Sequence, residues 1–197
     1  MNEPGTEQQD SSDMQRLVNG NDAALNNLME RHGERLFHYL IRQLQNEEDA
    51  ADIAQEAFVR VYQHRATFDP NRKFSTWLYT IATNLVRDRL KWRSRHPQVS
   101  LHQTVGESDS TMADVLPDSK PLPDNVLASN ERTQSVRNAI ATLPEDLCTA
   151  LVLSEYELLS NAEIATVLRC SVKAVESRIY RAKQRLRELL RDALQLL

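Results

Sequence analysis

The chain is poor in residues that break a helix or cross-link a fold. Its 197 residues include only 4 glycines, 7 prolines and two cysteines, Cys148 and Cys170. So few turn-forming residues argue against a β fold, because strands need frequent turns. Two cysteines offer neither a disulfide framework nor a four-cysteine metal site, and they suit a reducing compartment.

Long apolar segments and catalytic motifs are also missing. No apolar run reaches the roughly 18 residues of a membrane-spanning helix, and the polar, acidic first residues do not resemble a secretory signal. There is no phosphate-binding glycine loop, no HExxH motif and no metal-ligand spacing among the five histidines, His32, His38, His64, His96 and His102. We therefore expect a cytoplasmic protein that is not an enzyme and binds no cofactor, metal or small-molecule substrate.

The net charge of −4 conceals an uneven distribution. Residues 1–13 carry four acidic and no basic side chains, and residues 97–130 carry five acidic side chains and one lysine. By contrast, residues 87–95 hold five basic side chains and one acidic, and residues 169–191 hold eight basic and two acidic. Local patches rather than net charge set the field that a polyanion meets, so both basic stretches are candidate nucleic-acid contacts.

Hydrophobic periodicity predicts helices in two blocks. Residues 14–96 show apolar side chains at helical spacing, and a second helical block covers residues 130–197. Residues 97–129 show no periodicity and contain four prolines, which predicts a flexible acidic linker. Residues 1–13 are predicted to be a disordered acidic tail. The expected fold is all-α, with two small helical domains joined by the linker.

The C-terminal block carries a helix-turn-helix pattern. Ser160 and Glu163 form a capping box that starts one helix, Arg169-Cys170 form a short turn, and Ser171 can cap the next helix. The buried stripe expected for that second helix is Val175, Ile179, Ala182 and Leu186.

The opposite face of that second helix is polar and basic. Its outward residues are Lys173, Ala174, Ser177, Arg178 and Arg181. Such a helix can enter the major groove with its first turns and hold phosphates with its later arginines. The pattern predicts duplex DNA binding but does not identify the class of regulator.

The N-terminal block ends with aromatic residues beside a second polar stripe. A loop with Phe68 and Phe74 precedes a helix that Ser75 or Thr76 can cap. The outward stripe of this helix is Asn84, Arg87, Asp88, Lys91 and Arg95. Aromatic rings beside basic side chains suit unpaired bases, which stack on the rings while the cations hold the backbone. For Trp77 and Tyr79, placement in the core is an equally good interpretation.

Three blocks resemble the extracytoplasmic-function (ECF) sigma factors of the sigma-70 family. They are DxADIAQEAFVRVYQ (49–63), FSTWLYTIATN (74–84) and LPEDL…EIA…VxSRIYRAKQRLRE in the C-terminal block. The resemblance implies that residues 14–96 are region 2 and residues 130–197 are region 4. It implies a subunit that binds core RNA polymerase and directs promoter-specific transcription initiation, by recognising −35 duplex and by melting and capturing −10 DNA.

The resemblance assigns roles to matching positions. The surface implied to grip the clamp helices of the polymerase's largest subunit is Asp49, Asp52, Gln55, Glu56, Val59, Arg60 and Gln63. The residues implied to read −10 DNA are Phe68, Phe74, Ser75, Trp77, Asn84, Arg87, Asp88 and Lys91. Those implied to read −35 duplex are Ser171, Lys173, Ala174, Ser177, Arg178 and Arg181. Further implied partners are the polymerase flap and an anti-sigma factor.

Two departures and two alternatives remain. Arg169 stands where many family members have a small residue such as glycine, and Glu176 stands where a basic residue is frequent. Glu176 can either accept from a cytosine amino group or point away from phosphate. One alternative is a helix-turn-helix repressor or activator that is not a polymerase subunit and senses a ligand through residues 14–96. The other is a nucleic-acid enzyme, which the missing catalytic motifs disfavour.

Overall fold

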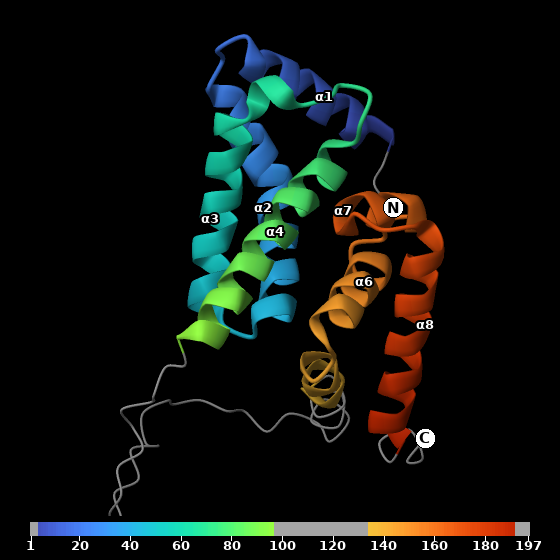
Figure 1. The fold of residues 1–197 in the computed structure, drawn as a ribbon. Helices are drawn as coiled ribbons and strands as arrows, with labels where there is room; N and C mark the ends of the chain where they lie inside the picture. Colours follow the sequence, from blue (N-terminus) through green and yellow to red (C-terminus); the bar gives the residue numbers. More distant parts are fainter. Residues whose placement is uncertain (1–3, 97–133, 192–197) are drawn as a thin grey trace, which may run out of the picture.

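The computed structural model describes residues 4–96 and 134–191, and within these ranges every regular element is a helix (Figure 1). The all-α prediction is therefore confirmed, while the predicted linker at 97–129 lies outside the described residues. The elements are α1 (Pro4–Val18), α2 (Ala23–Leu44), α3 (Glu47–Gln63), the 3₁₀ turn η1 (Arg65–Thr67), α4 (Phe74–Arg95), a helical segment at 134–141, α6 (Glu145–Glu155), α7 (Asn161–Leu168) and α8 (Val172–Leu189). None of the described helices is long and apolar enough to cross a membrane.

Helices α2, α3 and α4 form a bundle, and α1 lies across one end of it (Figure 1). Each bundle helix turns an apolar stripe inward, and the buried side chains include Leu28, Leu36, Leu40, Ile53, Phe58, Val61, Leu78 and Val86. One polar pair lies in this core: the hydroxyls of Tyr39 and Thr83 share a hydrogen bond of 2.8 Å. The chain reverses between α2 and α3 at Gln45, whose φ is 51°, and Asn46 then caps α3 by accepting from the backbone N–H of Asp49.

The prediction of a disordered tail at 1–13 is wrong for the described residues, because α1 begins at Pro4. Its acidic side chains Asp10 and Asp13 are buried and face α2 rather than water. Arg31 Nε donates to Asp10 at 2.9 Å and Arg31 Nη2 to Asp13 at 2.6 Å, while His32 Nε2 lies 2.8 Å from Asp10. The acidic composition of residues 1–13 predicted a solvated segment, whereas two of its carboxylates face inward.

The pKa of Asp13 reflects this pairing. Burial alone would raise the pKa of its carboxyl, but hydrogen bonds from Arg31 and Asn27, with the charges of Arg31 and Arg16, lower it below its ordinary value. The ionised form of Asp13 therefore stabilises the packing of α1 on α2.

The start of α4 also differs from expectation. The helix begins at Phe74, its N-cap position is Lys73, and no side chain caps it. Ser75 and Thr76, the predicted caps, lie inside the first turn and are buried. The Thr76 hydroxyl has no hydrogen-bond partner among the described residues. Phe74, the first residue of the helix, is buried against the bundle.

The helix-turn-helix prediction is confirmed in detail. Ser160 and Glu163 form a complete capping box at α7, and Ser171 caps α8 by accepting from the backbone N–H of Ala174. Arg169 occupies the turn with a left-handed φ of 52°. The stripe of α8 faces inward as expected, with Val175 and Ala182 fully buried and Ile179 and Leu186 partly buried.

The two helical blocks pack against each other. Helix α6 contacts α2, and α7 contacts α4, so that α6 and α7 lie between the N-terminal bundle and α8 (Figure 1). We call this contact of α6 and α7 with α2 and α4 the domain junction. Buried apolar side chains from both blocks belong to one continuous core.

Candidate nucleic-acid and protein interfaces

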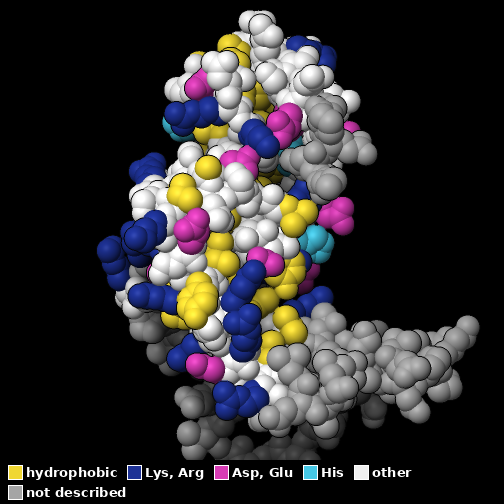
Figure 2. Space-filling model, turned by 90° about the vertical axis from the view of Figure 1, so that its right-hand side faces the viewer, with side chains coloured by type: hydrophobic (Ala, Val, Ile, Leu, Met, Phe, Trp, Pro, Cys, Tyr) yellow, Lys and Arg dark blue, Asp and Glu magenta, His cyan; other side chains and the backbone are white. Residues whose placement is uncertain are grey.

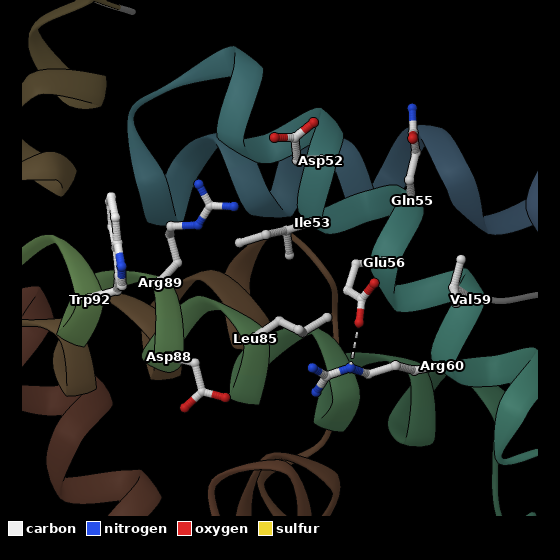
Figure 3. Close-up of a pocket in the computed structure, with 10 residues that line it drawn as sticks. All are labelled: Asp52, Ile53, Gln55, Glu56, Val59, Arg60, Leu85, Asp88, Arg89 and Trp92. Carbon is white, nitrogen blue, oxygen red and sulfur yellow. Dashed lines mark hydrogen bonds and ion pairs between the residues drawn. The ribbon is translucent and has the colours of Figure 1, made fainter.

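An open groove of about 550 Å³ runs between α3 and α4 (Figure 3). The mostly buried Ile53 and Leu85 line it, and the large apolar side chains Val59 and Trp92 beside it are 46% and 47% exposed. Its remaining lining residues are charged or polar: Asp52, Gln55, Glu56, Arg60, Asp88 and Arg89. Exposed apolar groups surrounded by charged ones mark a surface for another macromolecule.

Most of the residues predicted to bind polymerase come together at this groove. Asp52, Gln55, Glu56, Val59 and Arg60 line it, and Arg60 Nε donates to Glu56 at 2.9 Å (Figure 3).

Two of the predicted polymerase residues, Asp49 and Gln63, do not line the groove. Gln63 is exposed at the last turn of α3, and the Asp49 carboxylate is engaged by arginines of α4. The sequence reasoning missed the α4 side of the groove. The spacing of Leu85, Arg89 and Trp92 is helical and could have indicated it.

The aromatic residues near the start of α4 form one cluster. The ring centroids of Phe68 and Trp77 lie 5.2 Å apart, and Phe74 lies 6.2–6.3 Å from each. Phe74 and Tyr79 are buried, whereas Phe68 and Trp77 are partly exposed. The core interpretation therefore holds for Tyr79 and Phe74, and only Phe68 and Trp77 present ring surface on which a base can stack.

The predicted −10 reader is partly covered by other elements. Asp88 and Lys91 are exposed, Asn84 is half-buried, and Ser75 is buried. Arg87 is half-buried and its Nε donates to Glu145 of α6 at 3.3 Å.

Lys73, in the loop before α4, is also engaged by other elements. Its Nζ lies 2.6 Å from Glu7 of α1 and 3.2 Å from Glu163 of α7. Hydrogen bonds to Glu7 and Glu163 raise the pKa of Lys73. These contacts hold the loop against both blocks.

Helix α8 presents a polar, basic face to solvent. Lys173, Ser177 and Arg181 are exposed on it, Ala174 is half-buried, and Ser171 serves as the cap. Figure 2 shows Lys and Arg side chains gathered on this side of the molecule with fewer acidic ones among them.

Arg178 lies differently from the prediction. It turns toward the start of α6, where its Nε is 3.4 Å from Asp146 and its Nη1 donates to Cys170 Sγ at 3.3 Å. A residue missed in the sequence is Tyr180, which is 63% exposed one turn after Ser177 and accepts a hydrogen bond from Gln184. Its helical spacing from Lys173 and Ser177 was the available signal.

No metal centre accompanies these faces. Across 4–96 and 134–191, no group of three or more His, Cys, Asp or Glu side chains is arranged to hold an ion. The chemistry that the three faces offer is recognition: apolar and charged contacts in the groove, stacking beside α4, and phosphate and base-edge contacts on α8.

Comparison with known proteins agrees with this arrangement. A model of sigma-70 region 2 matches residues 28–96, and one of sigma-70 region 4 matches residues 133–186. The ECF RNA polymerase sigma factor SigW of Bacillus subtilis is 36% identical over 180 residues, which cover 91% of this chain and 95% of SigW. The RNA polymerase sigma-H factor of Pseudomonas aeruginosa is 34% identical over 196 residues, covering 95% of this chain and 99% of that protein.

A solved structure also shares the fold. The structure of CnrH in complex with the cytosolic domain of CnrY matches with a TM-score of 0.69 at 27% identity, covering 93% of this chain and 98% of CnrH. Helices of both blocks thus have counterparts in a solved structure. The chain belongs to the ECF family of RNA polymerase sigma factors.

Proposed function

We propose that this chain directs transcription initiation through three faces. The α3–α4 groove binds core RNA polymerase, the aromatic loop with α4 reads unpaired −10 DNA, and α8 reads −35 duplex. Region 2 includes α1 as well as the predicted span 14–96, because α1 packs into the same core. Region 4 comprises residues 130–197, joined to region 2 by the segment at 97–129.

The observation that carries the proposal is the groove. Val59 of α3 and Trp92 of α4 expose large apolar side chains there. A protein partner that supplies apolar side chains with complementary charges would cover them, as protein interfaces commonly do. The clamp helices of the polymerase's largest subunit are the partner that the family likeness implies, with the flap as a second contact for region 4.

The DNA roles rest on chemistry matched to each target. Phe68 and Trp77 offer ring faces near the start of α4, which suit a flipped base, and the exposed Lys91 further along the same helix suits the DNA backbone. Lys173, Ser177 and Arg181 offer contacts that suit a major groove and its phosphates. We assign no catalytic step to the chain, since sigma factors are not an enzyme class, and we expect it to act in the cytoplasm beside the polymerase.

An anti-sigma factor is a further proposed partner. CnrH, which shares the fold of this chain, was solved bound to the cytosolic domain of another protein, CnrY. For this chain we propose a protein partner that inhibits it by occupying a surface that polymerase or DNA would otherwise use.

Core polymerase pull-down followed by in vitro transcription tests the proposed function. The purified chain should associate with core polymerase and confer initiation on a subset of genomic promoter fragments. DNA binding without polymerase association would overturn the proposal and favour the alternative, a helix-turn-helix regulator that is not a polymerase subunit.

A further inference from the structure

A buried carboxylate lies at the domain junction. Glu157, which follows α6, is only 8% exposed although a free glutamate is charged in water at neutral pH. The hydroxyl of Tyr79 on α4 donates to Glu157 Oε2, and Arg35 Nε on α2 lies 3.6 Å from the same oxygen. Arg35 Nη2 also donates to the Glu157 backbone carbonyl at 3.3 Å. One residue of region 4 is thereby fixed by two helices of region 2.

Because the contact is buried, we expect it to be either fully formed or fully broken. Burial raises the pKa of the Glu157 carboxyl, against the lowering effects of the Tyr79 hydrogen bond and the Arg35 charge. A buried charge is tolerated only while its partners remain, so removing either the carboxylate or the Tyr79 hydroxyl leaves an uncompensated group. Loss of one partner should therefore shift the junction toward separation instead of weakening it slightly.

Further polar contacts across the junction engage the predicted −10 reader. Arg87 pairs with Glu145 of α6, and Lys73, inside the aromatic loop, pairs with Glu163 of α7. In addition, the Thr149 hydroxyl donates to Gln43 Oε1 at 2.9 Å. In this closed arrangement, Arg87 of the predicted −10 reader and Lys73 of its loop already have carboxylate partners.

The other two faces are free of the junction. None of the junction contacts described above involves Asp52, Val59 or Trp92 of the groove, and Lys173 and Arg181 on α8 are exposed. Within the described residues, the closed arrangement therefore engages the −10 reader and leaves the groove and the basic face of α8 accessible.

We infer that the free protein occupies a closed state, held by the Glu157 contacts, in which region 4 engages Arg87 of the −10 reader and Lys73 of its loop while the polymerase-binding groove stays open. The inference rests on the proposed function for the identity of the engaged face. It orders events: polymerase can capture the closed form, whereas single-stranded DNA must wait for the junction to separate.

Cys148 supplies a direct measure of closure. It is buried at the junction, where its Sγ lies 3.9 Å from the Arg42 carbonyl of α2. Burial raises the pKa of this thiol to about 11, so it should react slowly with an aromatic disulfide reagent at neutral pH while the junction is closed. A Cys170→Ser background removes the other cysteine, so that the labelling rate reports Cys148 alone.

Two variants should open the junction from opposite sides. Glu157→Ala acts on region 4 and Tyr79→Phe acts on region 2, so a folding defect confined to one block cannot explain both. Each should speed Cys148 labelling about tenfold, the equivalent of losing one hydrogen bond to a charged group. Glu155→Ala is the matched control, because Glu155 pairs with Lys183 inside region 4 at 2.9 Å and does not touch region 2.

DNA binding by the free full-length chain completes the test. With a fluorescent pool of random single-stranded oligonucleotides, both opening variants should bind about tenfold more tightly than the parent, whereas affinity for a random duplex pool should not change. Circular dichroism should show unchanged helix content.

Three results would overturn the inference. First, Cys148 of the parent protein could label as fast as it does in urea, which would mean that it is not protected. Second, both variants could label at the parental rate. Third, labelling could become faster with no gain in affinity for single-stranded DNA. If labelling rises but neither polymerase nor any DNA is bound, the proposed function is wrong as well. If the chain fails to bind core polymerase but both variants still gain affinity for single-stranded DNA, only the proposed function is contradicted.

Discussion

Arg89 Nη1 of α4 lies 2.6 Å from Oδ1 of Asp49 in the first turn of α3. Arg93 engages the other oxygen of the same carboxylate, whose side chain is only 14% exposed. The salt bridge joins the beginning of α3 to the end of α4. Asp49, which the family likeness implies to contact polymerase, therefore has a structural role that the sequence did not indicate.

Removing this carboxylate should destabilise region 2. Asp49→Ala leaves two arginines without their shared partner, which should cost roughly 2 kcal/mol because hydrogen bonds to charged groups are at stake and the arginines are partly exposed. Urea unfolding measures the loss. Asp52→Ala, an exposed carboxylate on the same helix, is the control and should change stability by less than about 0.5 kcal/mol. Equal stability of the two variants would contradict the structural role.

Charge reversal in the groove should abolish polymerase binding without unfolding the chain. Asp52 and Glu56 are exposed and line the groove, so Asp52→Arg with Glu56→Arg reverses its charge and costs at most the surface ion pair of Glu56 with Arg60, about 0.5 kcal/mol. Pull-down of core polymerase is the readout. Glu47→Arg with Glu48→Arg makes the same charge change at exposed positions outside the groove and should retain binding. Undiminished capture by the groove variant would refute the assignment.

The two DNA faces should fail at different steps. Arg181→Ala should weaken duplex binding across sequences and reduce the salt slope by about one, since one phosphate contact is lost. Arg178→Ala is its control, because Arg178 is turned toward Asp146 and should change the slope less. Binding titrations over a range of salt concentrations make the comparison.

Asn84→Ala should spare closed-complex formation on duplex promoter and reduce opening. On a template already melted around −10, this variant should recover more activity than Arg181→Ala. Equal recovery of both variants in transcription assays would show that the faces do not act separately.

Glycine should stabilise the protein at two positions where the backbone is left-handed. Arg169 has φ 52° and Leu158 has φ 57°, a conformation that costs side chains with a Cβ about 1–2 kcal/mol. Arg169→Gly and Leu158→Gly should each stabilise the protein by roughly 1 kcal/mol, after the entropy of glycine in the unfolded chain is subtracted. Arg185→Gly, in the interior of α8, should instead destabilise by about 1 kcal/mol. Thermal unfolding distinguishes these signs.

Acid should release α1 before the rest of region 2. The folded-state pKa of Asp13 lies below the ordinary value of 3.8 for an aspartate, so its contribution to stability is complete above that value and is lost as the pH falls through the lower, folded pKa. Hydrogen exchange of α1 amides should accelerate in that window. Asp13→Asn should be less protected at neutral pH and should flatten the response. A wild-type profile that tracks global unfolding at every pH would contradict a local release.

Local signals were read correctly from the sequence, and contacts distant in sequence were not. The capping box at Ser160, the cap at Ser171 and the stripe through Val175 and Ala182 depend on neighbours within one or two turns, so the pattern contains them. The groove was half predicted for the same reason: the outward face of α3 follows from its period.

The errors came from polar groups that point inward. Asp10 and Asp13 read as solvated acids, yet they meet Arg31, some twenty residues further along the chain. Glu157 is another inward-pointing carboxylate, and its partner Tyr79 lies in the other block. A prediction from periodicity places charged side chains in water, because it contains no information about a partner that is distant in sequence.

The hydrogen bond between Tyr39 and Thr83 constrains how this core can drift over generations. Either hydroxyl lost alone, as in Tyr39→Phe or Thr83→Val, strands the other in an apolar interior at about 1–3 kcal/mol, whereas losing both is nearly neutral. A lineage that moves between the polar and apolar versions must therefore cross a less stable intermediate or make both changes together. The two residues should therefore be substituted together, although they lie on different helices.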